Sequence, residues 1–266
     1  MKRKKAVARK KRKKKIVLAY SGGLDTSIIL KWLQENFKAD VICYTADIGQ
    51  ELNKKKIINN AKNLGVKNVI IENLQNEFVK EYVFPMIRGH AVYEGVYLLG
   101  TSIARPLIAK AQIRVAKKFK AYAVSHGSTG KGNDQVRFEL GYYFFNPKMK
   151  VIAPWRIWNL NSRTDLIKYA KKNKIPIPQD KKGEPPFSID DNLFHTSTEG
   201  KVLENPKNQA PEFIFQRTNS PEKAPNKPSF VTINFKYGDP YGINGKKLSP
   251  SKLLEKLNLL AGKNAI

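Results

Sequence analysis

Short apolar runs alternate with longer amphipathic segments between residues 16 and 176. The apolar runs predict buried strands at 16–20, 41–46, 68–72, 121–124 and 150–155. Between them, apolar residues recur at the spacing of one helical face over 27–36, 54–64, 100–119 and 164–173. This alternation indicates an α/β domain in which helices cover both faces of a parallel sheet.

Three residues mark expected helix ends or breaks. Gly65 directly follows the second helical segment, which is typical of a C-cap. Thr164 opens the last segment and is the expected N-cap. Pro106 lies within 100–119, where we expect either a break or the first turn of the helix.

The residue composition of the chain changes near residue 176. Prolines stand at 176, 178, 185 and 186, and the following stretch predicts loops. Residues 230–238 then alternate like a half-exposed strand, and residues 250–260 predict a helix. We therefore expect a domain boundary near 176, with an α/β domain at 16–176 and a second, partial α+β domain at 177–266.

Composition excludes several classes of protein. The chain has 266 residues, of which 41% are hydrophobic, and its apolar runs are far shorter than the ~20 residues of a membrane span. We expect no membrane partner. Cys43 is the single cysteine, so an intramolecular disulfide is impossible and a cysteine zinc site is not expected. Its apolar surroundings predict a buried core residue.

The net charge of +27 is unevenly distributed. Residues 1–15 hold 11 of the 49 basic residues and no acid, which leaves 38 basic against 22 acidic residues elsewhere. Such a block repels itself, so we expect a disordered basic tail at 1–15. It is either a solvated tail or a segment with non-specific affinity for nucleic acid or acidic lipid. No apolar region of a secretory signal follows it.

The sequence "AYSGGLDTS", residues 19–27, joins a predicted strand to a predicted helix. A helix N-terminus offers unpaired N–H groups and partial positive charge, and glycines let an oxygen approach the backbone. With the hydroxyls of Ser21, Thr26 and Ser27, this junction predicts a phosphate cradle. Asp25 would repel phosphate directly, but it fits if a magnesium ion lies between them.

This junction lacks the G-x-x-x-x-G-K-[ST] pattern of a Walker A loop. Its Ser-Gly-Gly-x-Asp-x-Ser pattern instead resembles the ATP pyrophosphatase, or PP-loop, group. The resemblance implies a Rossmann-like fold of the adenine nucleotide alpha hydrolase type. It also implies that ATP is cleaved between its α and β phosphates and that a substrate is adenylated.

A second motif, "VSHGSTGKGNDQVRFE" at residues 124–139, follows a predicted strand. It reads as a loop that could bind an anion and an amine together. Asp134 can accept hydrogen bonds from an ammonium, and Arg137 can clamp a carboxylate through paired N–H donors.

Together with "YLLGTSIARP" and "ENPKNQAP", this motif resembles the argininosuccinate synthase family over residues 15–266. The resemblance implies a cytoplasmic ligase of arginine biosynthesis that uses ATP and Mg²⁺ and forms homotetramers at full length. Citrulline would attack the α-phosphorus of ATP to give citrullyl-AMP and pyrophosphate. Aspartate would then displace AMP.

The resemblance also implies roles for individual residues, with Asp25, Asp134 and Arg137 as the catalytic candidates. ATP would contact Ala19, Tyr20, Ser21, Gly22, Gly23, Leu24, Asp25, Thr26, Ser27, Ala46 and Gly127. Citrulline would contact Tyr97, Ser102, Asn133, Arg137, Ser188 and Ser197, and aspartate would contact Thr129, Asn133 and Asp134. No residue set has the spacing of a resident metal site. Tyr97 could instead pack on a helix, Ser102 could hydrogen-bond back within its own helix, and Ser188 could be exposed in a proline-rich loop. His126 could merely orient its loop.

Family members continue beyond residue 266, and their further part carries a glutamate and a tyrosine that bind citrulline. We therefore expect the second domain to be incomplete, ATP binding to be retained and turnover to be weak or absent. Two alternatives stay open: a PP-loop enzyme that adenylates tRNA, favoured by the charge, and a catalytically inactive ATP-binding fragment.

Overall fold

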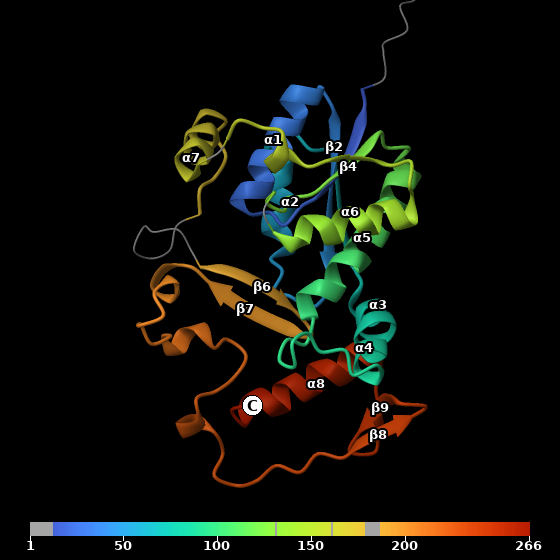
Figure 1. Ribbon diagram of the computed structural model, residues 1–266, viewed down its shortest axis with the longest axis vertical. Coiled ribbons are helices and arrows are strands. Elements are labelled where there is room, and N and C mark those ends of the chain that lie inside the picture. The colour runs from blue at the N-terminus through green and yellow to red at the C-terminus, as the bar shows by residue number, and fades with distance from the viewer. Residues whose placement is uncertain (1–12, 131, 161, 179–186) are drawn as a thin grey trace, which may run out of the picture.

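The computed structural model describes residues 13–130, 132–160, 162–178 and 187–266. A five-stranded parallel sheet dominates its first part (Figure 1). The strand order is β3-β2-β1-β4-β5, so β1 is the central strand and the chain crosses over it. The strands are β1 (Lys15–Ala19), β2 (Asp40–Asp47), β3 (Asn68–Asn73), β4 (Ala123–Ser125) and β5 (Lys150–Ile152).

Period-two alternation divides the side chains of the sheet between two apolar cores. In β1, Ile16 and Leu18 enter one core and Val17 enters the other. The first core includes residues of α1 (Leu24–Phe37), α2 (Lys54–Asn63) and α7 (Arg163–Lys172). The second includes residues of α5 (Gly100–Phe119) and α6 (Asn133–Phe145). The predicted fold, a parallel sheet with helices on both faces, is confirmed.

The local predictions met different outcomes. Gly65 has φ +81° just past α2, which is the left-handed conformation expected of a terminating glycine. The N-cap of α7 is Ser162 rather than Thr164, because Ser162 and Asp165 form a reciprocal capping box. Pro106 neither breaks α5 nor starts it. The helix continues through it, flanked by the buried Ala104 and Leu107.

Residues 75–88, for which no element was predicted, form one helical stretch. It comprises α3 (Gln75–Phe78), a π-helical turn (Val79–Val83) and α4 (Phe84–Arg88). The second part of the chain adds the antiparallel hairpin β6–β7 (Ser188–Asn192, His195–Glu199) and a three-stranded sheet of β8 (Ile233–Lys236), β9 (Asp239–Ile243) and β10 (Lys246–Lys247). Helix α8 (Pro250–Lys263) lies against α3, where Ser251 Oγ is 2.9 Å from Asn76 Oδ1. An α+β arrangement is therefore confirmed for this part.

Short 3₁₀ turns complete the described secondary structure. The predicted strand 150–155 ends at Ile152 and passes into one of them. The predicted strand 230–238 is shorter, because only Ile233–Lys236 pairs with a neighbour. The turns are Pro154–Arg156, Lys201–Glu204, Glu212–Ile214 and Pro221–Lys223.

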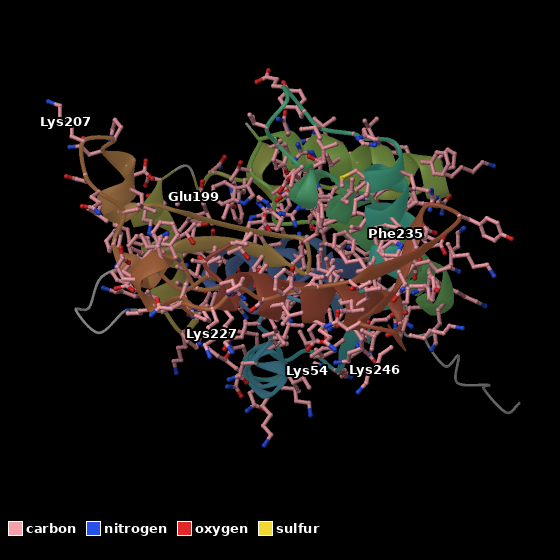
Figure 2. All side chains as sticks on the ribbon, turned by 90° about the horizontal axis from the view of Figure 1, so that it is seen from below. Lys54, Glu199, Lys207, Lys227, Phe235 and Lys246 are labelled. Carbon is pink, nitrogen blue, oxygen red and sulfur yellow. The ribbon has the colours of Figure 1, made fainter. Side chains whose placement is uncertain are left out.

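The expectations drawn from composition can be placed on the structure. The predicted basic tail lies mostly outside the described residues, but Lys15 already belongs to β1 and the Lys14 carbonyl accepts from Asp40 N at 2.8 Å. Cys43 is fully buried in β2, and this burial raises the pKa of its thiol. Lys207, Lys227 and Lys246 extend from the outer surface (Figure 2). Within the described ranges, no helix has the length and apolarity needed to cross a membrane.

A buried amide ties the central strand to its neighbour. Gln112 of α5 donates from Nε2 to the carbonyls of Val17 at 2.8 Å and Ser125 at 2.9 Å. Its Oε1 accepts from the buried Tyr142 hydroxyl at 2.6 Å. The side chain therefore holds β1, β4 and α6 together.

Replacing this amide tests its contribution to stability. Gln112→Leu should lower the free energy of unfolding by ~2–4 kcal/mol, because it leaves a buried hydroxyl and two carbonyls without their partner. The double variant Gln112→Leu/Tyr142→Phe should lose less than the two single losses combined, since both partners are then apolar. Urea unfolding measures all three variants. Additive losses in the double variant would contradict this coupling. The matched control is Gln34→Leu, which removes one part-buried hydrogen bond to Leu64 O.

Candidate functional site

The cradle predicted at residues 19–27 forms between β1 and α1. Gly23 is the N-cap of α1 and no side chain caps the helix, so the first amide N–H groups face outward with the positive end of the helix dipole. Gly22 has φ +81°, and a Cβ there would lie 2.9 Å from Ile57 Cγ1. Asn60 Nδ2 also donates to the Gly22 carbonyl at 3.1 Å. Helix α2 therefore supports the loop from behind and requires glycine at this position.

The hydroxyls of the cradle fall into two groups. Ser21 Oγ and Thr26 Oγ1 lie 3.0 Å apart, and Ser21 is exposed. Ser27 is buried and lies 3.0 Å from the Tyr20 hydroxyl. Burial raises the pKa of Tyr20 to about 12, so its hydroxyl stays protonated and available as a donor. Ser21 and Thr26 could therefore contact an anion, whereas Ser27 and Tyr20 brace the turn from inside.

Asp25 lies in the first turn of α1, with an exposed side chain. Partial removal from water raises the pKa of its carboxyl, and the positive charge of Arg163, the first residue of α7, opposes this rise. An acid placed among backbone donors can hold a cation beside a bound anion. In the described part of the chain, however, no three His, Cys, Asp or Glu residues gather in a way that would hold a metal by themselves.

The two sequence motifs meet above the boundary between β1 and β4. A Cβ on Gly127 would lie 3.0 Å from Thr26 Cγ2, so the loop after β4 contacts the first turn of α1. Ala46, near the end of β2, is buried, and its carbonyl accepts from Gln50 Nε2 at 2.7 Å. In open parallel sheets, ligands bind at the carboxyl ends of the strands where the winding direction reverses. Both motifs border that position.

The second motif is only partly a loop, which corrects its sequence interpretation. Helix α6 begins at Asn133 after Gly132, its N-cap, and this end also lacks a side-chain cap. Thr129 and Asn133 are exposed. His126 is fully buried and stacks 5.4 Å from Phe138, while its Nδ1 accepts from Ser128 N at 3.2 Å. Burial lowers the pKa of His126, so a neutral ring orients the loop.

Asp134 and Arg137, in the first turns of α6, belong to a charged network that we call the Asp134 network. It comprises Arg105, Asp134, Arg137 and Asp190. Arg137 donates to Asp134 Oδ1 at 2.8 Å, and Arg105 Nε donates to Oδ2 at 2.9 Å. Both carboxylate oxygens of Asp134 therefore have an arginine partner.

The predicted citrulline serines lie on the β6–β7 hairpin. Asp190 is paired in register with Ser197 and stands two residues after Ser188, so the three side chains share one face. Asp190 Oδ2 accepts from Thr101 Oγ1 at 3.0 Å and from Arg105 at 2.8 Å. This face is therefore directed toward α5, although both serines remain exposed.

Tyr97 and Ser102 lie together at the start of α5. The Tyr97 hydroxyl is 3.5 Å from Ser102 Oγ and accepts from Thr101 N at 3.2 Å. Desolvation would raise the pKa of Tyr97, but the hydrogen bonds from Ser102 and Thr101 lower it overall. The Tyr97 ring also packs edge-on against His195 of the hairpin at 5.9 Å. Tyr97 and Ser102 therefore lie together at the amino end of α5, beside the β6–β7 hairpin.

Sequence reasoning missed three residues of this region, namely Thr101, Arg105 and Asp190. Thr101 and Arg105 are four residues apart within a predicted helix, so they share one of its faces. That spacing was the available signal. Asp190 could not have been found in this way, because the hairpin that carries it was not predicted.

A separate cavity of about 670 Å³ lies beside the ends of β2 and α8. It is lined by residues such as Asp47, Gln75 and Asn258, and it contains none of the residues predicted to bind substrates. Asp47 there already pairs with Lys54 at 3.2 Å and accepts from Gln75 at 2.7 Å. The cavity therefore does not coincide with the cradle.

The parallel sheet and the loop between β1 and α1 define an α/β protein of the HUP type. A family model described as the arginosuccinate synthase N-terminal HUP domain matches residues 15–176, and one described as the arginosuccinate synthase C-terminal domain matches residues 187–266. The chain belongs to the argininosuccinate synthase family.

Curated relatives agree with this assignment. The argininosuccinate synthase of Pelagibacter ubique (strain HTCC1062) is 82% identical over 256 residues, which cover 96% of this chain and 65% of the relative. Those of Xanthobacter autotrophicus and Parvibaculum lavamentivorans are 61% and 60% identical, over 95% of this chain and 62% of each relative. The chain thus spans somewhat less than two thirds of the length of these relatives.

Substituting two glycines with the same φ angle distinguishes the cost of backbone strain from the cost of a close side-chain contact. Gly22 and Gly65 both have φ +81°, but Gly65 has no atom within 4 Å of an added Cβ. Gly65→Ala should cost ~1–2 kcal/mol for the left-handed conformation alone. Gly22→Ala should cost at least ~1 kcal/mol more, because its Cβ also meets Ile57. Denaturant unfolding measures both, and equal losses would show that α2 does not press on the loop.

Proposed function

We propose that this chain carries the substrate-binding machinery of an AMP-forming ligase that joins citrulline and aspartate to give argininosuccinate, a step of arginine biosynthesis. The observation that carries the proposal is the contact between the two motif loops at the β1–β4 boundary. A bound ATP could there face the cradle, while amino acids face the Asp134 network and the β6–β7 hairpin.

The reaction would proceed in two displacements at the same pocket. The ureido oxygen of citrulline would attack the α-phosphorus of ATP, forming citrullyl-AMP and releasing pyrophosphate. The α-amine of aspartate would then attack the activated ureido carbon and release AMP. Neither step needs a covalent nucleophile from the protein, so catalysis would rest on alignment and on neutralising charge at the α-phosphate.

Residues 19–27, with Ala46 and Gly127, would bind ATP. The free amide N–H groups at the start of α1 would donate to phosphate oxygens, joined by the hydroxyls of Ser21 and Thr26. Gly127 would keep the space beside the first turn of α1 open, because a Cβ at this position would lie 3.0 Å from Thr26 Cγ2. Ser27 would act indirectly, through its buried contact with Tyr20.

Asp25 fits the magnesium that the family implies. Mg²⁺ typically takes one or two carboxylates together with phosphate oxygens and water, and the cradle presents one carboxylate beside the phosphate donors. When bound, the ion would supply positive charge to the phosphate oxygens. The residues of this chain would hold ATP and keep the Asp25 carboxylate aligned with it.

The amino-acid substrates would bind around the amino ends of α5 and α6. Tyr97, Ser102, Asn133, Arg137, Ser188 and Ser197 would contact citrulline, and Thr129, Asn133 and Asp134 would contact aspartate. Arg137 can pair with a carboxylate and Asp134 with an ammonium, as two zwitterionic substrates require. The proximity of the hairpin face to α5 through Asp190 supports this grouping.

Further family properties accompany the proposal. The two matched ranges support a domain boundary near residue 176. A cytoplasmic location and homotetramers of the full-length family are also proposed on the resemblance. The alternative that the chain adenylates tRNA has less support. If RNA binding vanished in a salt titration when residues 1–12, which precede the described part of the chain, were removed, RNA would be a ligand of that segment and not the substrate.

Substitution of Asp25 tests the cradle. Asp25→Asn should weaken Mg-ATP binding about tenfold, equivalent to ~1.4 kcal/mol. Because the pKa of Asp25 is raised, its ionised form is lost on mild acidification earlier than that of an ordinary carboxyl. The affinity of the wild type for Mg-ATP should therefore fall as the pH decreases. The Asp25→Asn variant should lose less affinity over the same range, because only the titration of ATP itself remains. Calorimetry across this pH range decides, and parallel curves would exclude Asp25 as a ligand.

Calorimetry and product analysis test the substrates. We expect ATP, citrulline and aspartate each to bind, and any turnover to yield argininosuccinate and AMP in equal amounts. Quantifying argininosuccinate and AMP by mass spectrometry measures the last point. Failure of ATP to bind would refute the proposed function.

A further inference from the structure

Arg105 joins two parts of the site that are far apart in the sequence. Its Nε donates to Asp134 Oδ2 at 2.9 Å, in the first turn of α6, and a terminal nitrogen donates to Asp190 Oδ2 at 2.8 Å, in the β6–β7 hairpin. The same terminal nitrogen is also 2.8 Å from Asp134 Oδ2. One guanidinium therefore links the two elements that carry the proposed aspartate and citrulline contacts.

The environment of Arg105 keeps this link charged. Its side chain is 17% exposed, and such burial on its own would lower the pKa of the guanidinium. Asp190 and Asp134 together reverse that effect and raise the pKa. A planar guanidinium can reach two carboxylates through donors in fixed directions, whereas an ammonium is a point charge without that geometry.

Arg105 holds two carboxylates, whereas Arg137 holds one and could exchange it for a substrate carboxylate. Among the described residues, Arg137 pairs with Asp134 and with no second carboxylate. It is partly exposed and is proposed to pair with the citrulline carboxylate. When Arg137 turns to such a ligand, Asp134 loses the partner of its Oδ1 atom. Arg105 would still hold the Oδ2 atom and would leave Oδ1 open to an ammonium.

We propose that Arg105 is a positioning residue that fixes Asp134 and the Ser188–Ser197 face of the hairpin relative to each other. The inference rests on the proposed function, since it takes aspartate to bind at Asp134 and citrulline at the two serines. Thr101 supports the same link, because its hydroxyl donates to Asp190 at 3.0 Å. The proposed role of Arg105 is exerted through Asp134 and Asp190.

Affinities measured by calorimetry for Mg-ATP, citrulline and aspartate test this role. Arg105→Gln should weaken both amino acids about tenfold or more while ATP changes less than about twofold, because a charged link is lost without altering the cradle. Asp190→Asn should weaken citrulline more than aspartate, because Arg105 would still hold Asp134. Arg105→Lys should recover only part of the loss, since it restores the charge but not the two-way geometry.

Arg114→Gln is the matched control, because Arg114 lies on the same helix but pairs with Glu72 of β3. It should leave all three affinities unchanged. If Arg105→Gln does not fold, Arg105→Lys and Asp190→Asn provide the comparison. Wild-type affinities for both amino acids in the Arg105 variants would overturn the inference alone. A wild-type chain that bound ATP but neither amino acid would instead overturn the proposed amino-acid sites, and the inference with them.

Discussion

The parallel pairing of β1 with β4 is the constraint on which the site depends. Val17 lies opposite Val124 and Leu18 opposite Ser125, so the two strands end within one residue of each other although they are far apart in the sequence. The chain leaves β1 into the cradle and leaves β4 into the second motif. Each loop alone offers a few donors. Only because the strands are neighbours does Gly127 reach Thr26 and create one region with two uncapped helix ends.

The charges of the Asp134 network balance one another, although the chain as a whole is strongly basic. The protein carries +27, yet the Asp134 network is built from acids and arginines in which each carboxylate has a guanidinium partner. Pairing fixes these side chains and balances their charges. A zwitterionic substrate could therefore replace an internal ion pair with ion pairs of its own. Many surface lysines instead extend into solvent, where exposed charges contribute little to stability (Figure 2).

Sequence pattern predicted the strands of the main sheet to within about two residues at most ends, because buried parallel strands and amphipathic helices carry strong local periodicity. It failed where structure depends on distant partners. The hairpin strand Ser188–Asn192 has no apolar alternation, and it is held by Thr101 and Arg105 from another part of the chain. Ser162 prevailed over Thr164 as an N-cap because Asp165 completes a capping box only from that register. The cradle was predictable because its chemistry is contiguous in sequence, whereas the Asp134 network is not.

Helix α5 shows how one element can organise both halves of the site. Thr101, Arg105 and Gln112 fall along nearly the same stripe of the helix, at separations of four and seven residues. The first two hold Asp190 and Asp134, and the third holds β1 and β4. A rotation of α5 would therefore displace the hairpin, α6 and the two strands together. The continuity of the helix through Pro106, between Arg105 and Gln112, is what keeps these three contacts in a single register.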